Sequence, residues 1–138
     1  MTSSTPEYAH LLPPSWKTQV SDWLHEDTPS FDYGGFVVGE VEREAFLLGK
    51  GSQNAVLAGV PFFTEVFEQL GCTYVFLLVL TTCLSSKRKI SVKWHLNEGD
   101  SFQPIKHVAT VQGKARHLLL GERVALNLLA RCSGIATK

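Results

Sequence analysis

Apolar positions at helical spacing predict a helix in each third of the chain. The first helix is predicted within residues 11–29. It begins near a proline pair, which suits a first helical turn, and ends at a Thr-Pro step. The apolar residues of this helix fall at the i, i+4, i+7, i+8 spacing of one buried stripe: Trp16, Val20, Trp23 and Leu24. A second helix is predicted over 61–71, from Pro61 to Gly71, with a stripe of phenylalanine, valine and leucine between them. A longer, mostly apolar helix covers 118–134, and we expect it to be buried on more than one side.

Short apolar runs bounded by glycine or turn residues predict strands between these helices. The predicted strands lie in residues 44–51, 55–60, 92–102 and 106–115. A turn at 97–100 ends the third of these runs, and Gly34 with Gly35 predicts another turn at 32–36. The element order predicts an α+β fold: an N-terminal α/β sandwich, with an antiparallel sheet and helices on one face, that ends in a long helix.

Residues 74–91 fit this pattern poorly. Their apolar core from Val75 to Leu80 is shorter than the roughly 20 residues that a membrane-spanning helix needs, and a basic group at 87–89 follows it. The segment could be a buried strand with a solvated loop, a membrane-surface contact or foreign sequence. The predicted domains are a flexible N-terminus (1–9), a sandwich domain (10–116) with 74–91 as an atypical insertion, and the long helix (117–138).

The composition adds few constraints on function. Lys and Arg number 13, as do Asp and Glu, so the chain has no bulk basic field for nucleic acid. The three cysteines form no CxxC pair and the five histidines have no metal-ligand spacing, so we predict no metal site and a reducing compartment. The polar N-terminal residues are unlike a signal or transit peptide. We therefore expect a cytoplasmic protein.

The long C-terminal helix carries a narrow polar stripe. Arg123, Asn127 and Arg131 lie at i, i+4 and i+8, so they share one helix face. Arg123 lies in the first turns of the helix predicted over 118–134, where the helix dipole is positive and arginine is a poor choice for stability. A guanidinium beside a helix N-terminus would suit a carboxylate or a phosphate. From spacing alone, a solvated stripe is the simpler interpretation.

Several sequence blocks, in the same order, resemble the quinolinate phosphoribosyltransferases. The blocks are LLPP and WLHED (11–14, 23–27), VLAGVPFF (56–63), FEQLGC (67–72), WHLNEGDSF (94–102) and HLLLGERVALNLLARCSGIAT (117–137). Together they cover nearly the whole chain except 74–91. The resemblance implies an enzyme of NAD biosynthesis that uses Mg²⁺ to join quinolinate to phosphoribosyl pyrophosphate, with nicotinate mononucleotide, pyrophosphate and CO₂ as products.

The resemblance also implies an architecture and one site residue. In that family an α/β sandwich precedes an α/β barrel that holds most of the active site, and the sandwich of one subunit caps the barrel of its dimer partner. By this resemblance Arg123, in the GER motif, binds the anionic substrates across the subunit interface. Asn127 and Arg131 occupy matching positions, and we interpret them as helix-packing or interface residues. The family's barrel is absent from this chain, which is therefore expected to contain no catalytic or metal-binding residue and to be inactive alone.

Alternatives remain at this point. Removing 74–91 restores the family's spacing between Cys72 and Trp94, so this segment could be translated intron or another gene-model error. The parent enzyme could instead be a related type II phosphoribosyltransferase that uses nicotinate. The chain could also be a non-catalytic interaction module, or carry a membrane-surface patch at 74–91. We expect self-association, as a dimer or larger assembly, and no nucleic-acid or membrane partner.

Overall fold

The computed structural model describes residues 8–51, 54–79 and 91–138. Four α-helices and five strands follow a short 3-10 helix within these ranges. The elements are the 3-10 helix Tyr8–Leu11, α1 (Trp16–Asp27), α2 (Tyr33–Val38), β1 (Glu42–Gly49), β2 (Ala55–Val56), α3 (Val60–Val79), β3 (Ser91–Trp94), β4 (Ser101–Phe102), β5 (Lys106–Lys114) and α4 (Ala115–Ala136).

The strands form two antiparallel sheets. In the three-stranded sheet the long strand β5 is central and pairs with β1 on one side and β3 on the other. The register of β1 on β5 shifts between Leu47 and Leu48, which marks a β-bulge. The short strands β2 and β4 form a separate two-stranded sheet. All described pairings are antiparallel, as the sequence predicts.

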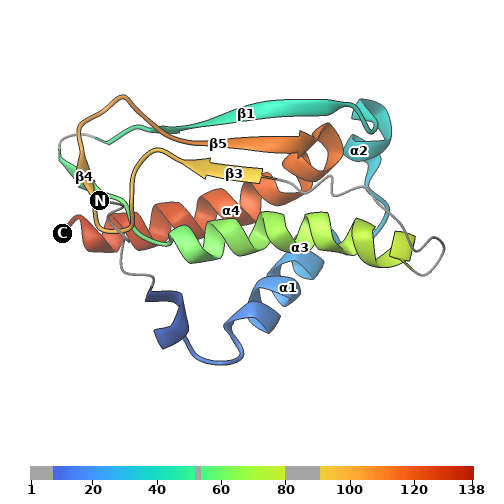
Figure 1. Ribbon diagram of the computed structural model, residues 1–138, viewed down its shortest axis with the longest axis horizontal. Helices are drawn as coiled ribbons and strands as arrows, with labels where there is room; N and C mark the ends of the chain where they lie inside the picture. The colour runs from blue at the N-terminus through green and yellow to red at the C-terminus, as the bar shows by residue number, and fades with distance from the viewer. Residues whose placement is uncertain (1–7, 52–53, 80–90) are drawn as a thin grey trace.

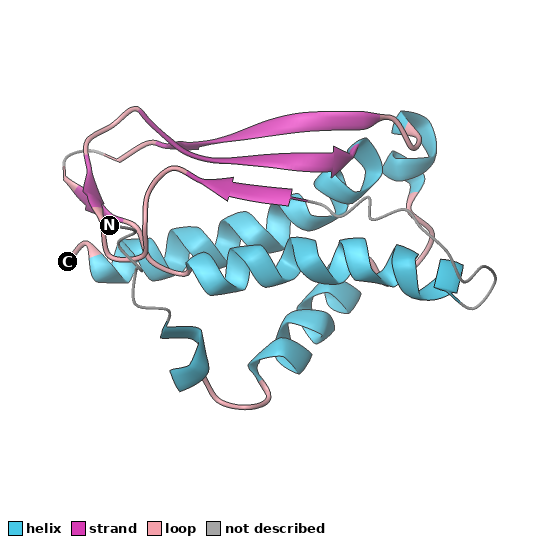
Figure 2. Cartoon of the chain, viewed as in Figure 1, coloured by secondary structure: helices cyan, strands magenta, loops and turns pink. Residues whose placement is uncertain are grey.

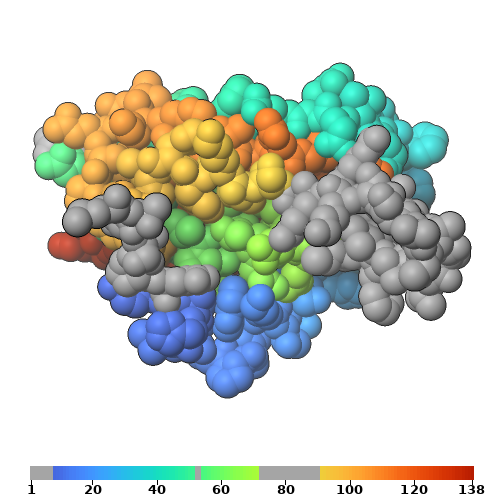
Figure 3. Space-filling view, viewed as in Figure 1, coloured from blue at the N-terminus to red at the C-terminus, as the bar shows by residue number. Residues whose placement is uncertain are grey.

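Helices α1, α3 and α4 lie in layers on one face of the larger sheet. Helices α3 and α4 run side by side beneath the sheet, and α1 packs against both from the side away from it (Figures 1 and 2). The same order of layers is visible on the molecular surface, where α1 (blue) lies below α3 (green) and the strands lie above (Figure 3). This arrangement is the predicted α/β sandwich that ends in a long helix.

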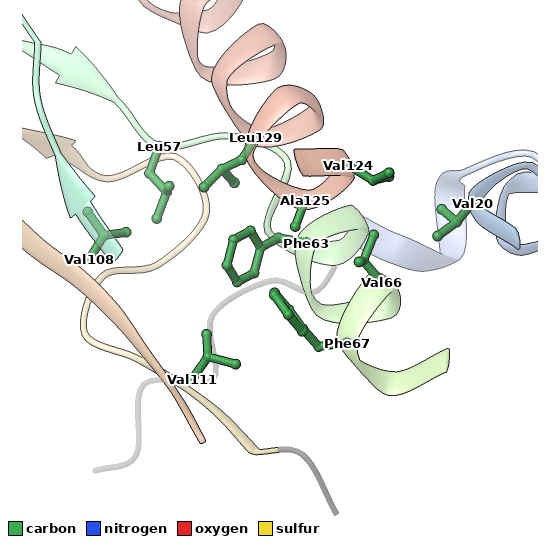
Figure 4. Packing of buried hydrophobic residues seen from close by; sticks show 10 residues of the cluster. All are labelled: Val20, Leu57, Phe63, Val66, Phe67, Val108, Val111, Val124, Ala125 and Leu129. Carbon is green, nitrogen blue, oxygen red and sulfur yellow. The ribbon is translucent and has the colours of Figure 1, made fainter. Parts of the chain in front are cut away.

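The hydrophobic core lies between the sheet and the helices. Phe63 and Phe67 of α3 lie between Val108 and Val111 of β5 and the buried face of α4 (Figure 4). The ring of Phe63 contacts those of Phe67 and Trp94, with centroids 5.1 and 5.2 Å apart. Aromatic pairs at these separations add packing energy beyond the area that they bury. The core therefore fixes α3 and α4 relative to the sheet.

Two predicted boundaries of local structure are wrong. Helix α3 does not end at Gly71 but continues to Val79, because residues 72–79 contain no proline or further glycine to stop it; a strand at 74–79 is therefore also wrong. Residues 33–38 form the short helix α2 rather than a turn, because the side chain of Asp32 accepts a hydrogen bond of 2.9 Å from Gly35 N and so caps it. The remainder of the atypical segment, 80–90, lies outside the described residues.

The other predicted elements are present with adjusted ends. Of the strand predicted at 55–60, only Ala55–Val56 is a strand, and α3 begins at Val60. Within the described ranges, no helix has the length and hydropathy needed to cross a bilayer. The division into domains at residues 9 and 116 stays a prediction.

Candidate functional site

Helix α4 begins earlier than predicted. Strand β5 passes directly into it at Ala115, whose backbone N–H donates to the Val41 carbonyl at 2.9 Å. Arg123 therefore lies about two turns inside the helix. The effect of a helix dipole on a charge falls off within the first turn. The prediction that Arg123 lies at the positive end of the dipole is thus wrong, and any anion binding there depends on the guanidinium itself.

One side of α4 packs closely against α3. A Cβ atom at Gly121, the glycine of the GER motif, would come within 2.7 Å of the Phe67 ring and 2.9 Å of Leu70 Cδ1. Only glycine allows this approach of the two helices. Val124, Ala125 and Leu129 extend the buried side. Helix α4 contacts α1, α2, α3 and strands of both sheets, which confirms that it is buried on more than one side.

The polar stripe of α4 lies on its exposed side. Arg123, Asn127 and Arg131 are all exposed, and 76% of the Arg123 side chain is accessible. Nη1 of Arg123 lies 3.4 Å from Oδ1 of Asp27, at the C-terminal end of α1. Among the described residues, the side chains of Asn127 and Arg131 have no hydrogen bond or ion pair. The exposure of both residues argues against packing within this chain and leaves interface contact as their predicted role.

The C-terminal end of α4 is held by hydrogen bonds to the β2–α3 connection. Ser133 Oγ accepts from Ala58 N and donates to Ala58 O, both at 3.0 Å. Thr137 Oγ1 accepts from Val56 N at 3.0 Å. Gly59, with φ of 96°, also approaches Cys132, whose Cβ would lie 2.9 Å from an added Cβ. These contacts fix the direction in which α4 leaves the sandwich.

Glu98 caps α3 and was not identified from the sequence. Its two carboxylate oxygens accept from the backbone N–H groups of Gly59 and Val60, each at 2.8 Å. A carboxylate at a helix N-terminus satisfies free N–H groups and interacts favourably with the helix dipole. Glu98 is almost 40 residues away in the sequence, so no local capping signal could reveal this role.

Charged groups surround the start of α4. Glu40 pairs with Lys114 and also with Arg116, whose Nε lies 2.9 Å from Oε1. The hydrogen bond from Lys114 holds the pKa of Glu40 below its ordinary value, and the charge of Arg116 acts in the same direction. Burial lowers the pKa of His117, as does the charge of Arg116. These groups have partners within the chain, so we assign them to anchoring α4 on the sheet.

The described residues provide little for metal or thiol chemistry. No group of three His, Cys, Asp or Glu side chains in this part of the chain could hold a metal ion. Cys132 is half-buried, and burial raises the pKa of its thiol. A raised pKa keeps the sulfur protonated and therefore a poor nucleophile.

An apolar groove follows the side of α4 that faces β1; we call it the β1–α4 groove. One part has a volume of about 380 Å³, and an adjoining part of about 430 Å³ shares Leu47 and Leu126 with it. The first part is lined by Ala45, Phe46 and Leu47 of β1, by Leu119, Glu122 and Leu126 of α4, and by Phe63, Phe67 and Val111 at its base. Leu119 and Leu126 are 49% and 39% exposed, so the groove leaves apolar surface accessible beside the polar stripe.

Comparison with known proteins agrees with this architecture. Residues 36–133 match the family "Quinolinate phosphoribosyl transferase, N-terminal domain". Nicotinate-nucleotide pyrophosphorylases [carboxylating] from Rattus norvegicus and Homo sapiens are each 44% identical to the chain, over 92% and 94% of its length. These alignments cover 36% and 37% of the two relatives, so the chain spans little more than a third of their length.

Solved structures show the same fold. The NadC protein from Streptococcus pyogenes is 27% identical and superposes with a TM-score of 0.69, over 91% of this chain and 40% of its own. The nicotinate-nucleotide pyrophosphorylase from Francisella tularensis superposes with a TM-score of 0.73 at 23% identity, over 91% of this chain and 39% of its own. With the family match over most of its length, the chain belongs to the quinolinate phosphoribosyltransferase family and corresponds to its N-terminal domain.

Proposed function

We propose that this chain is the substrate-capping and dimerisation part of a quinolinate phosphoribosyltransferase of NAD biosynthesis. The intact enzyme would convert quinolinate and phosphoribosyl pyrophosphate into nicotinate mononucleotide, pyrophosphate and CO₂. The observation that carries this proposal is the family match over 36–133, which includes the GER motif of α4 with its exposed Arg123. The names of the relatives favour quinolinate over nicotinate as the substrate.

Arg123 is the residue that we assign to substrate. Quinolinate carries two carboxylates and its co-substrate carries phosphate groups, so their site needs fixed cations. The Arg123 guanidinium is largely exposed and contacts Asp27 through Nη1, which leaves its other N–H donors accessible. An arginine held on a helix in this way can bind a carboxylate or phosphate that belongs to a neighbouring subunit's site.

The exposed side of α4 is the surface that we assign to the second subunit. It combines the apolar β1–α4 groove with the polar stripe, as expected of an interface with an apolar centre and charged positions beside it. In the intact enzyme, Mg²⁺ would neutralise charge on the pyrophosphate leaving group. The described part of this chain holds no group of three His, Cys, Asp or Glu side chains that could bind a metal ion. A cytoplasmic location stays a prediction from the cysteine pattern.

A chimeric enzyme tests the proposal. Residues 8–138 would replace the matching N-terminal part of the Rattus norvegicus relative, and nicotinate mononucleotide formation would be measured. We expect activity in the chimera and none in the isolated chain. Arg123→Ala should lower kcat/KM by roughly 100-fold or more, because it removes a fixed charge from the substrate site.

Lys93→Ala is the matched control, since Lys93 is an exposed cation on β3, away from α4. It should leave kcat/KM nearly unchanged. A folded chimera without turnover, or equal losses in both variants, would contradict the proposed role. Clear turnover by the isolated chain would contradict its assignment as a capping part alone.

A non-catalytic interaction module is the second candidate. The accessible groove favours it, because a chain that exposes such a surface can pair with itself or with full-length subunits. Co-purification with an intact subunit, without any effect of Arg123→Ala on catalysis, would support this function instead.

A further inference from the structure

The buried stripe of helix α1 ends at a charged residue, Asp27. Val20, Trp23 and Leu24 form the stripe, and Val20 is fully buried against the other helices. Asp27 lies seven residues after Val20 and four after Trp23, so it occupies the next position on the same face. Its side chain is only 19% exposed. A carboxylate at a largely covered position needs a specific partner.

The position of Asp27 makes this need greater. It is the last residue of α1, where the negative end of the helix dipole disfavours a carboxylate. The helix end itself is closed by the backbone bond from Thr28 N to Leu24 O at 3.1 Å, which leaves the Asp27 side chain uninvolved. Among the described residues, the cation that pairs with Asp27 is Arg123, at 3.4 Å.

Packing between α1 and α4 brings the two residues together. Val124, the residue after Arg123, is buried, and its side chain points toward Val20 of α1 (Figure 4). The Arg123 side chain therefore projects from α4 at the edge of the α1–α4 contact, within reach of the C-terminal end of α1. Because the ion pair uses Nη1, the guanidinium plane is held at one corner while its remaining donors stay accessible.

Arg131 provides a comparison on the same stripe. It lies two turns further along α4, is also exposed, and has no side-chain partner among the residues that the structure describes. An arginine without a partner samples many rotamers, and fixing it on a ligand costs conformational entropy. The two arginines thus differ in restraint, although the sequence gives them equivalent positions.

We propose that Asp27 is a positioning residue for Arg123: its carboxylate restrains the guanidinium at Nη1 and directs the free donors toward the anionic substrate. This inference rests on the proposed function for its substrate, but the restraint itself can be measured without substrate. It concerns the side chain of Arg123 only.

Side-chain NMR of the full chain, labelled with ¹⁵N-arginine, tests the restraint. The order parameter at Nε of Arg123 should exceed that of Arg131 by roughly 1.5-fold in the wild-type chain. Asp27→Asn should reduce the Arg123 order parameter to that of Arg131, whereas Asp27→Glu should retain most of the difference between them. Asp22→Asn removes an exposed carboxylate from the same helix as a control and should change neither arginine.

Salt separates an ion pair from simple packing. Raising NaCl to about 0.5 M screens exposed charges and should lower the Arg123 order parameter in the wild-type chain but not in Asp27→Asn. The wild-type measurement needs no variant, so it tests the ion pair even if the substitution affects folding. An Arg123 order parameter that is unchanged by both Asp27→Asn and salt would overturn the proposal.

Titration with quinolinate (pyridine-2,3-dicarboxylate) distinguishes this inference from the proposed function. If Arg123 contacts substrate, its Nε–H signal should shift at least about twofold more than that of Arg131. Equal shifts with an intact Asp27-dependent restraint would count against substrate contact, while the restraint would stand. A selective Arg123 shift without an Asp27-dependent restraint would support substrate contact and overturn the positioning role of Asp27.

Discussion

The two long sides of α4 are built differently. Toward α3, Gly121 allows close helix contact, and Ala125 and Leu129 are buried against the core. Toward β1, the β1–α4 groove leaves Leu119 and Leu126 partly exposed. The α3 side is thus completed by the chain's own core, whereas the β1 side exposes apolar surface that a partner can cover. The contacts toward α3 therefore serve stability, and the surface toward β1 remains for assembly.

Truncating one aromatic ring in the core and one on the open rim of the groove gives the largest expected contrast. Phe63 is 3% exposed and contacts two other aromatic rings, so Phe63→Ala should cost about 3–5 kcal/mol in the free energy of unfolding. Phe46 lines the groove and is 61% exposed, so Phe46→Ala should cost less than about 1 kcal/mol. Urea unfolding of both variants measures the two values. Equal losses would show that the β1 side is as tightly packed as the α3 side.

Adding one methyl group at two glycines of α4 gives a smaller contrast with opposite signs. Gly121→Ala should destabilise by about 1–2 kcal/mol, because the new Cβ would meet the Phe67 ring. The higher helix propensity of alanine offsets only part of this cost. An added Cβ at Gly134 meets nothing within 4 Å, so Gly134→Ala should stabilise by about 0.5–1 kcal/mol through helix propensity. Thermal unfolding at matched concentrations measures both. Stabilisation by Gly121→Ala would refute close packing of α3 on α4.

Local patterns in the sequence were sufficient for most of the fold. The apolar stripe of α1, the glycine-bounded strands and the apolar length of α4 all depend on neighbours a few residues apart, and all are present in the structure. The end of α3 was missed because Gly71 resembles a helix stop while the residues after it contain no helix breaker. The start of α4 was missed because β5 passes into it without a capping side chain.

The site was less accessible to sequence reasoning because its partners are distant in the chain. Neighbours one apart on a helix do not face each other, so Glu122 is no natural partner for Arg123, and the structure places Glu122 in the groove. Helical spacing cannot reveal Asp27, which lies on a different helix in the first quarter of the chain. The cap of α3 by Glu98 likewise depends on how the turn before β4 lies against the start of the helix. Such pairs follow from tertiary packing, which local periodicity does not encode.

A charge placed in the groove gives the smallest effect on stability and the sharpest test of assembly. Leu126 is 39% exposed, so Leu126→Lys should change the free energy of unfolding by less than about 0.5–1 kcal/mol. If the groove binds a second copy, the same change buries a charge at an apolar interface and should weaken self-association by roughly tenfold or more. Sedimentation velocity over a concentration series measures the association. Lys93→Glu, on β3 and away from the groove, is the control and should leave the association constant unchanged. A wild-type chain that stays monomeric throughout, or a Leu126→Lys variant that associates as well as wild type, would show that the open side of α4 does not mediate self-association.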